Sequence, residues 1–283
     1  MAEAYSDPLA VKPYTRPVLG TVEVPGSKSI TNRMLILACM ADHPVTLTGA
    51  LFSDDSHHMV DCLKKLGFEV HADEEARSIR VEGTTGVIPA EQASLFVGVA
   101  GTAARFLTAF CATSNGGEFT LDGTEQMRKR PMKGLLDALE SQGTQIVSNN
   151  SFFPATLSPI GLQGGNVQLE ASASTQLLSA LLMVAPLAKE DLSIEVSGGA
   201  EKKPFVRLTQ ELMYRFGQPK QEVEDLGAGR VLLKVKAGVT YSIPETVAIE
   251  PDASAASYFL SLPLVVGGTV TVKGLHSNSL QGD

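Results

Sequence analysis

Residues 24–33 read VPGSKSITNR, a stretch that combines a Pro-Gly break, hydroxyl side chains and two cations. The preceding residues 21–24 have the composition of a short strand, and from Ile30 onward apolar residues recur at helical spacing. Pro25 and Gly26 interrupt the chain between these two patterns. The stretch therefore predicts a turn from a strand into a helix.

A helix that starts at this turn presents its first backbone N–H groups, and the positive end of its dipole, beside residues 27–29. Lys28 and Arg33 add full positive charges to these partial ones. A nucleotide-binding P-loop is excluded, because its lysine directly follows a glycine, whereas Ser27 separates Gly26 from Lys28. An anion site and an ordinary serine-capped helix start both fit this stretch, so the rest of the chain must decide.

Composition and charge narrow the class of protein. The 283 residues are enough for one large or two moderate domains, and 43% apolar with 19% charged residues is typical of a globular protein. With 31 acidic and 23 basic residues the net charge is −8, which argues against nucleic acid or an anionic membrane as a partner. An anionic ligand therefore requires a local basic pocket.

The cysteines and the N-terminal region indicate the compartment. Cys39, Cys62 and Cys111 stand singly in apolar helical stretches, without the spacing of a disulfide framework or a zinc site. Residues 1–17 lack the continuous apolar core of a secretory signal, and no apolar run is long enough to span a bilayer. We expect a cytoplasmic protein that does not enter a membrane.

A repeated pattern organises the chain. Three amphipathic stretches end at Gly67, Gly143 and Gly217, which follow one another at nearly equal intervals, and glycine suits the end of a helix because it tolerates positive φ. Small or hydroxyl residues open an earlier helix in each unit, and Ser29, Thr102 and Thr175 are spaced equally along the chain. The pattern predicts an α/β fold (or α+β) in which a β-α-β-α-β-β unit is used three times between residues 21 and 235.

A fourth copy of the unit begins at residues 247–250, continues through a helix at 253–265 and reaches a strand at 269–274. Residues 279–283 then stand where the earlier units begin their second helix. Half a unit leaves a strand unpaired and a helix face uncovered. We therefore expect the chain to be a fragment of a longer protein or to need a partner chain.

Five motifs in this order and spacing carry a resemblance to a known family. They are residues 24–33, 98–105 (GVAGTAAR), 128–132 (RKRPM), 174–176 (STQ) and 203–204 (KP). Together they resemble the 5-enolpyruvylshikimate-3-phosphate synthase family, also called 3-phosphoshikimate 1-carboxyvinyltransferases. The UDP-N-acetylglucosamine enolpyruvyl transferases are the second alternative, but they differ at the first motif and use a cysteine on a loop, whereas Cys111 lies within an apolar helix.

The resemblance implies an architecture of six units in two globules, with the active site in the cleft between them. By this reading residues 26–250 form a complete three-unit globule of inverse α/β barrel-like type. Residues 1–25 and 251–283 are then parts of the second, incomplete globule.

The resemblance also implies a reaction, in which the carboxyvinyl group of phosphoenolpyruvate is transferred to the 5-hydroxyl of shikimate 3-phosphate. Lys28 is the implied catalytic residue of this chain and contacts both substrates, while Gly101 and Arg130 bind phosphoenolpyruvate. No cofactor and no metal are implied. The implied substrate-binding residues are Lys28, Ser29, Arg33, Gly101, Arg130, Ser174, Thr175, Gln176 and Lys202.

Some residues are assigned away from the reaction. Arg105 is interpreted as a supporting residue and an ion-pair partner, and Asp55, in an acidic first helical turn, as a partner of Arg33. His57 and His58 point about 100° apart on a helix, so they do not share a metal ion. By resemblance the catalytic aspartate and a Lys-Glu pair lie beyond Asp283, which itself matches a different position.

We therefore expect the chain alone to be inactive, with a complementing C-terminal fragment as a candidate partner and a monomeric full-length protein. A non-catalytic module that binds shikimate 3-phosphate is an alternative function. An RNA-processing enzyme built from similar repeats is disfavoured by the acidic balance and the few aromatic residues.

Overall fold

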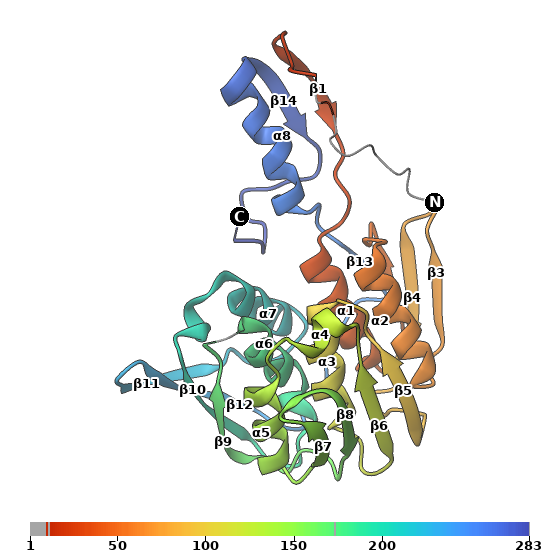
Figure 1. Cartoon of the computed structure of the whole chain (residues 1–283), viewed down its shortest axis with the longest axis vertical. Helices are drawn as coiled ribbons and strands as arrows, with labels where there is room; N and C mark the ends of the chain where they lie inside the picture. Colours follow the sequence, from red (N-terminus) through yellow and green to blue (C-terminus); the bar gives the residue numbers. More distant parts are fainter. Residues whose placement is uncertain (1–9, 11, 173, 283) are drawn as a thin grey trace.

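The computed structural model describes residue 10, residues 12–172 and residues 174–282. The chain forms a three-unit body and, beside it, a small lobe made of β1 (Val18–Val22), α8 (Ala253–Val266) and β14 (Gly268–Val272) (Figure 1). Asp283 lies outside the described residues. Within them, no helix is both long and apolar enough to cross a membrane.

Three inner helices form the centre of the body. They are the first helices of the three units: α1 (Lys28–Cys39), α3 (Gly101–Cys111) and α6 (Thr175–Val184). Every residue of α3 is buried, because α1 and α6 pack against it. Their small and apolar side chains allow this close packing, which explains why the sequence shows little polar face in these segments.

The second helices of the units are amphipathic and lie further out: α2 (Asp54–Lys65), α5 (Lys133–Ser141) and α7 (Pro204–Arg215). The predicted glycines follow them, and Gly67, Gly143 and Gly217 have φ of 89°, 92° and 92°. This left-handed conformation confirms the predicted helix ends. The short α4 (Glu125–Arg128) and the 3-10 turns η1 (Ala185–Leu187) and η2 (Ala200–Lys202) complete the helical segments.

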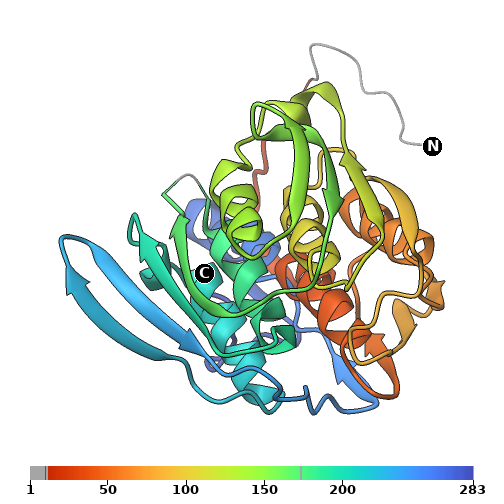
Figure 2. The same ribbon diagram turned by 90° about the horizontal axis from the view of Figure 1, so that it is seen from below.

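Three separate four-stranded sheets surround the inner helices (Figure 2). Their orders are β13-β2-β4-β3, β5-β6-β8-β7 and β9-β10-β12-β11, so the predicted repeat is present, while none of the sheets closes into a barrel. In β10 buried and half-buried residues alternate, as expected for a strand with one face on the core. The remaining strands are β2 (Pro44–Thr48), β3 (Val70–Asp73), β4 (Ser78–Glu82), β5 (Gln92–Phe96), β6 (Glu118–Asp122), β7 (Gln145–Asn149), β8 (Phe152–Ser158), β9 (Gly165–Glu170), β10 (Leu192–Ser197), β11 (Glu222–Gly227), β12 (Arg230–Val235) and β13 (Thr246–Ala248).

The first strand of the first unit is not the one that the repeat pattern predicts. β1 pairs in parallel with β14 of the small lobe, with Thr21 opposite Thr271. The place beside β2 is taken by β13, with Thr246 opposite Thr46. The body and the small lobe thus exchange strands, because residues of equal β propensity are assigned to a sheet by tertiary packing and not by local pattern.

Two crossing segments connect the body with the small lobe and are bonded to each other. Gly26 forms an antiparallel bridge with Pro251, Ser27 N donates to Glu250 O at 2.8 Å, and Asp252 N donates to Pro25 O at 2.9 Å. A Cβ on Gly26 would lie only 2.0 Å from the carbonyl oxygen of Gly49. Glycine is therefore required at the turn that was predicted from the sequence.

Candidate active site

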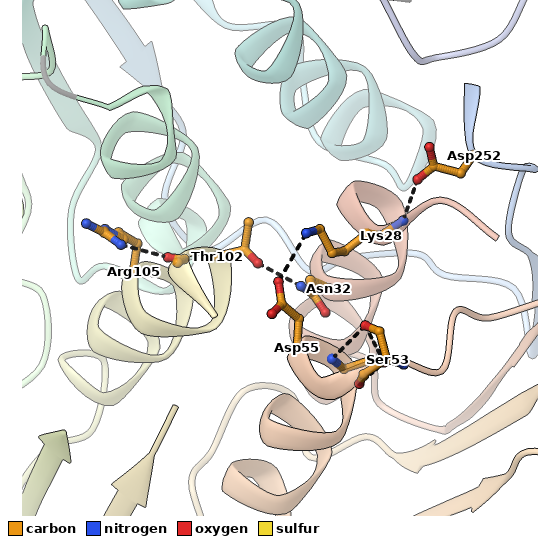
Figure 3. Close-up of polar contacts among 9 residues, drawn as sticks. Lys28, Asn32, Ser53, Asp55, Thr102, Arg105 and Asp252 are labelled. Atoms are coloured by element: carbon orange, nitrogen blue, oxygen red, sulfur yellow. Dashed lines mark hydrogen bonds and ion pairs between the residues drawn. The ribbon is translucent and has the colours of Figure 1, made fainter. Parts of the chain in front are cut away.

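Lys28 is the first residue of α1 and faces two carboxylates (Figure 3). Its Nζ lies 3.2 Å from Oδ2 of Asp55, and its backbone N donates to Oδ2 of Asp252 at 3.1 Å. The predicted pairing of Asp55 with Arg33 is therefore wrong. Because half of the Lys28 side chain is exposed, the pair with Asp55 is weak, about 0–1 kcal/mol, and can give way to a ligand.

Asp252 joins the starts of two helices. Its Oδ1 accepts a hydrogen bond from Ala255 N at 2.9 Å, which caps α8, while Oδ2 accepts from Lys28 N at the start of α1. From the sequence we expected the start of α1 to face a ligand, and this carboxylate was not predicted. No local sequence pattern indicates this contact, because Asp252 reaches the start of α1 only through the exchange of strands.

Arg33 lies inside the body and not on its surface. Only 1% of the residue is exposed, and its guanidinium donates to Thr209 Oγ1 at 2.7 Å, Phe205 O at 3.0 Å and Ser29 O at 2.8 Å. Burial lowers the pKa of Arg33 to about 9, so it is charged at neutral pH. The side chain holds α1, α6 and α7 together directly beneath Ser29, and its predicted contact with substrate stays a prediction.

Lys28 and Ser29 line a crevice of about 650 Å³ between the body and the small lobe. Phe205 at the start of α7 and Tyr258 of α8 also line it, and both are exposed. The crevice thus combines a cation, a hydroxyl and two aromatic rings with the carboxylates of Asp54, Asp55 and Asp252, a lining suited to a small polar ligand.

A second group of side chains converges on Gly101, the first residue of α3. A Cβ built there would lie 2.8 Å from Arg130 Nη1, 3.1 Å from Gln176 Oε1 and 3.2 Å from Arg105 Nη1. The structure therefore brings together three of the predicted residues, Gly101, Arg130 and Gln176. Because glycine leaves this space free, the polar atoms can reach a ligand at the helix start.

A buried hydrogen bond links the two groups. Asn32 lies one turn after Lys28 on α1, and its Nδ2 donates to Oγ1 of Thr102 at 2.7 Å (Figure 3). Thr102 follows Gly101 on α3, so the Lys28 group and the Gly101 group are neighbours across the contact of α1 with α3. The other amide atom of Asn32, Oδ1, is buried without a partner among the described residues.

The remaining predicted residues surround the start of α6 or lie outside the cluster. Ser174 is the N-cap of α6, and its Oγ accepts from Gln176 N at 3.2 Å, with Thr175 half-buried beside it. Lys202 is exposed on η2, and in the described residues no hydrogen bond or ion pair joins it to the others. The structure therefore does not bring Lys202 into the cluster.

The charges of the site are unbalanced. In the described part of the chain no carboxylate lies within ion-pair distance of Arg33, Arg105 or Arg130, although the net charge of the protein is −8. The ion-pair role predicted for Arg105 is therefore wrong. Uncompensated guanidinium groups beside the starts of α3 and α6 form an arrangement suited to an anion. No cluster of three metal-binding side chains occurs in the described ranges.

Repeated units, converging helix starts and unpaired cations define an α/β protein with a cluster of side chains suited to small anions. Its sequence matches the EPSP synthase (3-phosphoshikimate 1-carboxyvinyltransferase) family over residues 13–283. The chain belongs to this family, as the motifs of the sequence had indicated.

Named relatives and solved structures agree with the family assignment. A 3-phosphoshikimate 1-carboxyvinyltransferase of Opitutus terrae is 50% identical over 98% of this chain and 64% of its own length, and one of Trichormus variabilis is 44% identical over 98% and 64%. The chain thus spans about 64% of the length of these relatives. An EPSP synthase structure from Acinetobacter baumannii has a TM-score of 0.77 at 20% identity, covering 94% of this chain and 57% of that one, which shows a shared fold.

Proposed function

We propose that this chain supplies one side of the active site of a 3-phosphoshikimate 1-carboxyvinyltransferase. The reaction moves the carboxyvinyl group of phosphoenolpyruvate to the 5-hydroxyl of shikimate 3-phosphate and releases phosphate. The observation that carries the proposal is the convergence of Arg130 and Gln176 on Gly101, one helix contact away from Lys28. Both substrates are small polyanions, so a site of unpaired cations and helix starts suits them.

The geometry supports a division of roles between the two groups. Gly101 and Arg130 receive phosphoenolpyruvate, where the open helix start and a planar guanidinium suit a phosphate group. Lys28, in the neighbouring group, stabilises the charge that shifts during transfer. The residues assigned to shikimate 3-phosphate are Lys28, Ser29, Arg33, Ser174, Thr175, Gln176 and Lys202.

The same proposal includes the domain organisation. Residues 26–250 form the complete globule apart from its contacts with the small lobe, and residues 1–25 and 251–283 contribute to a second globule. Support comes from α8, in which Ala256 is the one buried residue, and from β14, which in the described chain pairs on one edge only. Further polypeptide that covers this lobe is the complementing partner that we expect catalysis to need.

Two alternative functions are distinguished by particular residues. In UDP-N-acetylglucosamine enolpyruvyl transferases a loop cysteine reacts, but Cys111 is fully buried and burial raises the pKa of its thiol, so it is unsuited to that chemistry. A module that only binds shikimate 3-phosphate is favoured by one observation. Both oxygens of Asp252 accept hydrogen bonds from the starts of α1 and α8, which leaves this carboxylate not ready to accept the proton of the substrate hydroxyl.

Calorimetry with shikimate 3-phosphate tests the proposed binding. We expect the chain to bind it, and Lys28→Ala to weaken binding about tenfold or more, because a hydrogen bond to a charged group contributes about 1.5–3 kcal/mol. The matched control is Lys133→Ala on α5, an exposed lysine paired with Asp137, which should leave the affinity unchanged. Absence of binding to the parent chain would refute the proposal.

Phosphate release separates the enzyme from the binding module. With both substrates, the chain alone should release no phosphate. Activity should appear when the C-terminal part of a full-length relative is added in trans. Binding without any release under the second condition would favour the module.

A further inference from the structure

Arg105 is a buried cation to which the proposed function gives no task. It lies one turn into α3, and 2% of the residue is exposed. Its Nη2 donates to Pro131 O at 2.8 Å and its Nη1 to Gly101 O at 3.2 Å. Its Nε is buried and has no hydrogen-bond partner among the described residues.

The two carbonyl groups that Arg105 holds belong to different parts of the anion site. Gly101 begins α3, and Pro131 directly follows Arg130, so one guanidinium spans the helix start and the segment that carries Arg130. A planar group with donors on two nitrogens can fix both carbonyl oxygens at once. Arg105 therefore sets the distance between the backbone of Gly101 and that of Arg130.

The charge of Arg105 has no counterpart in the described protein. Its Nη1 and the Nη1 of Arg130 both border the free space at Gly101, where a Cβ would lie 3.2 Å from the first atom and 2.8 Å from the second. Burial first, and the neighbouring charge of Arg130 second, lower the pKa of Arg105 to about 10, which still leaves it protonated at neutral pH. Two like charges held this close repel each other until an anion lies between them.

A purely structural role does not explain this arrangement. A buried charge without a counter-ion costs several kcal/mol, and two carbonyl oxygens can be satisfied by neutral donors at lower cost. The Nε of Arg105 has no hydrogen-bond partner, and no carboxylate of the described residues lies within ion-pair distance of its guanidinium. The fold therefore does not neutralise the charge of Arg105. A bound anion would supply the absent negative charge.

We propose that Arg105 is a positioning residue of the phosphate-binding site, which holds Arg130 against the start of α3 and makes the site more favourable for an anion. This inference rests on the proposed function of Gly101 and Arg130. It adds a residue that acts through Arg130 and that touches no reacting atom.

Inorganic phosphate is the probe, and the readout is the rise in unfolding temperature relative to chloride at equal ionic strength. From this rise an apparent affinity is obtained by linkage. Arg105→Lys keeps the charge but cannot form both hydrogen bonds to the two carbonyl oxygens, so we expect it to weaken the apparent affinity about three- to tenfold. Arg105→Met should weaken the apparent affinity further. Arg130→Ala should weaken it about tenfold or more.

A double-mutant cycle shows whether Arg105 acts through Arg130. In the Arg130→Ala background, Arg105→Lys should change the affinity by less than about twofold. The control is Arg128→Ala, which removes an exposed arginine of α4 paired with Asp122 and should leave the phosphate effect unchanged. Circular dichroism of each variant identifies those that fail to fold. If Arg105→Met fails to fold, Arg105→Lys alone provides the test.

Two outcomes would overturn the inference. If Arg105→Lys lowers the unfolding temperature but leaves the phosphate-induced rise intact, Arg105 is structural only. If the losses of phosphate affinity in Arg105→Lys and Arg130→Ala add in full in the double variant, Arg105 acts independently of Arg130. Calorimetry with shikimate 3-phosphate keeps this separate from the proposed function. A chain that binds shikimate 3-phosphate but shows no coupling refutes only the role of Arg105, whereas a chain that shows the coupling but does not bind shikimate 3-phosphate refutes only the proposed function.

Discussion

The three-unit body and the small lobe contain the same kind of helix in opposite surroundings. In α1, α3 and α6, buried residues number ten, eleven and eight, whereas α8, which follows its strand in the same way, has one. Tyr258, Leu264 and Val265 of α8 are 76%, 87% and 81% exposed, and the helix lies apart from the body (Figure 1). An apolar helix thus becomes a core helix only when neighbouring units enclose it, as in other proteins built from repeats.

The largest expected difference between the two regions comes from removing a leucine side chain. Leu182→Ala in α6, at 0% exposure, should lower the free energy of unfolding by about 2–5 kcal/mol, because it leaves a cavity. Leu264→Ala in α8 should change it by less than about 0.5 kcal/mol. Denaturation with urea measures both, and equal losses would contradict the contrast. Added polypeptide that covers α8 should raise the cost of Leu264→Ala.

The crossing between the two regions is tested at a glycine. Gly26→Ala brings a Cβ to 2.0 Å from the carbonyl oxygen of Gly49 and should cost about 1–3 kcal/mol of unfolding free energy. Gly20→Ala in β1 is the control, since no atom lies within 4 Å of its Cβ position and its φ is not positive. Thermal unfolding compares the two, and a Gly26→Ala chain as stable as Gly20→Ala would show that the crossing is looser than described.

Asp252 also connects the body with the small lobe, and its loss should lower the free energy of unfolding by less than Gly26→Ala does. Asp252→Ala removes the bonds to Ala255 N and Lys28 N and should cost about 0.5–2 kcal/mol, as for the loss of other N-caps. Hydrogen exchange should accelerate at the starts of both α8 and α1. Ser53→Ala, which removes the cap of α2 only, should accelerate exchange in α2 and in neither of the other two. Acceleration in α8 alone would show that the bond to α1 contributes nothing.

The smallest effect is expected for a pair of tyrosines. Tyr241 is buried in the body and its hydroxyl donates to Met183 O at 2.8 Å, so Tyr241→Phe should cost about 1 kcal/mol. Tyr258→Phe in the small lobe should cost close to nothing, because that ring is largely exposed.

Tyr241 also gives the body a pH dependence. Burial raises the pKa of its hydroxyl above the value of about 10 that it has in the unfolded chain. Its stabilising contribution is therefore complete below pH 10 and declines above it, by at most about 1.4 kcal/mol per pH unit. Urea denaturation between pH 9 and 11 should show a shallower decline for Tyr241→Phe than for the parent chain, and identical slopes would contradict the assignment.

Features encoded within one unit were predictable from the sequence. The glycine-terminated helices at Gly67, Gly143 and Gly217 follow from local spacing and from the conformational freedom of glycine. The proximity of Gly101 and Arg130, both in the second unit, followed from motifs that the family resemblance aligned, and the structure brings these two together.

Features that depend on contacts between units were not predictable. Ser29 and Arg33 lie one turn apart on one helix face, which suggested that both face a ligand, but the neighbours α6 and α7 supply acceptors that draw Arg33 inward. Asp55 consequently pairs with Lys28. Local sequence also gives no information about which sheet a strand joins, so the repeat pattern assigned β1 to the first unit, and only the family resemblance implied that residues 1–25 belong to the second globule.

The exchanged strands also affect how the chain folds as it is synthesised. Val18 pairs with Gly268, so the whole three-unit body must leave the ribosome before β1 meets β14. Because synthesis adds about 5–20 residues per second, this interval lasts on the order of tens of seconds, during which the edge of β1 is open to any other strand. The inner helices can assemble in that time, since their partners lie closer in sequence, but the small lobe cannot form until β14 emerges. We expect newly made protein to be most prone to aggregation within this interval.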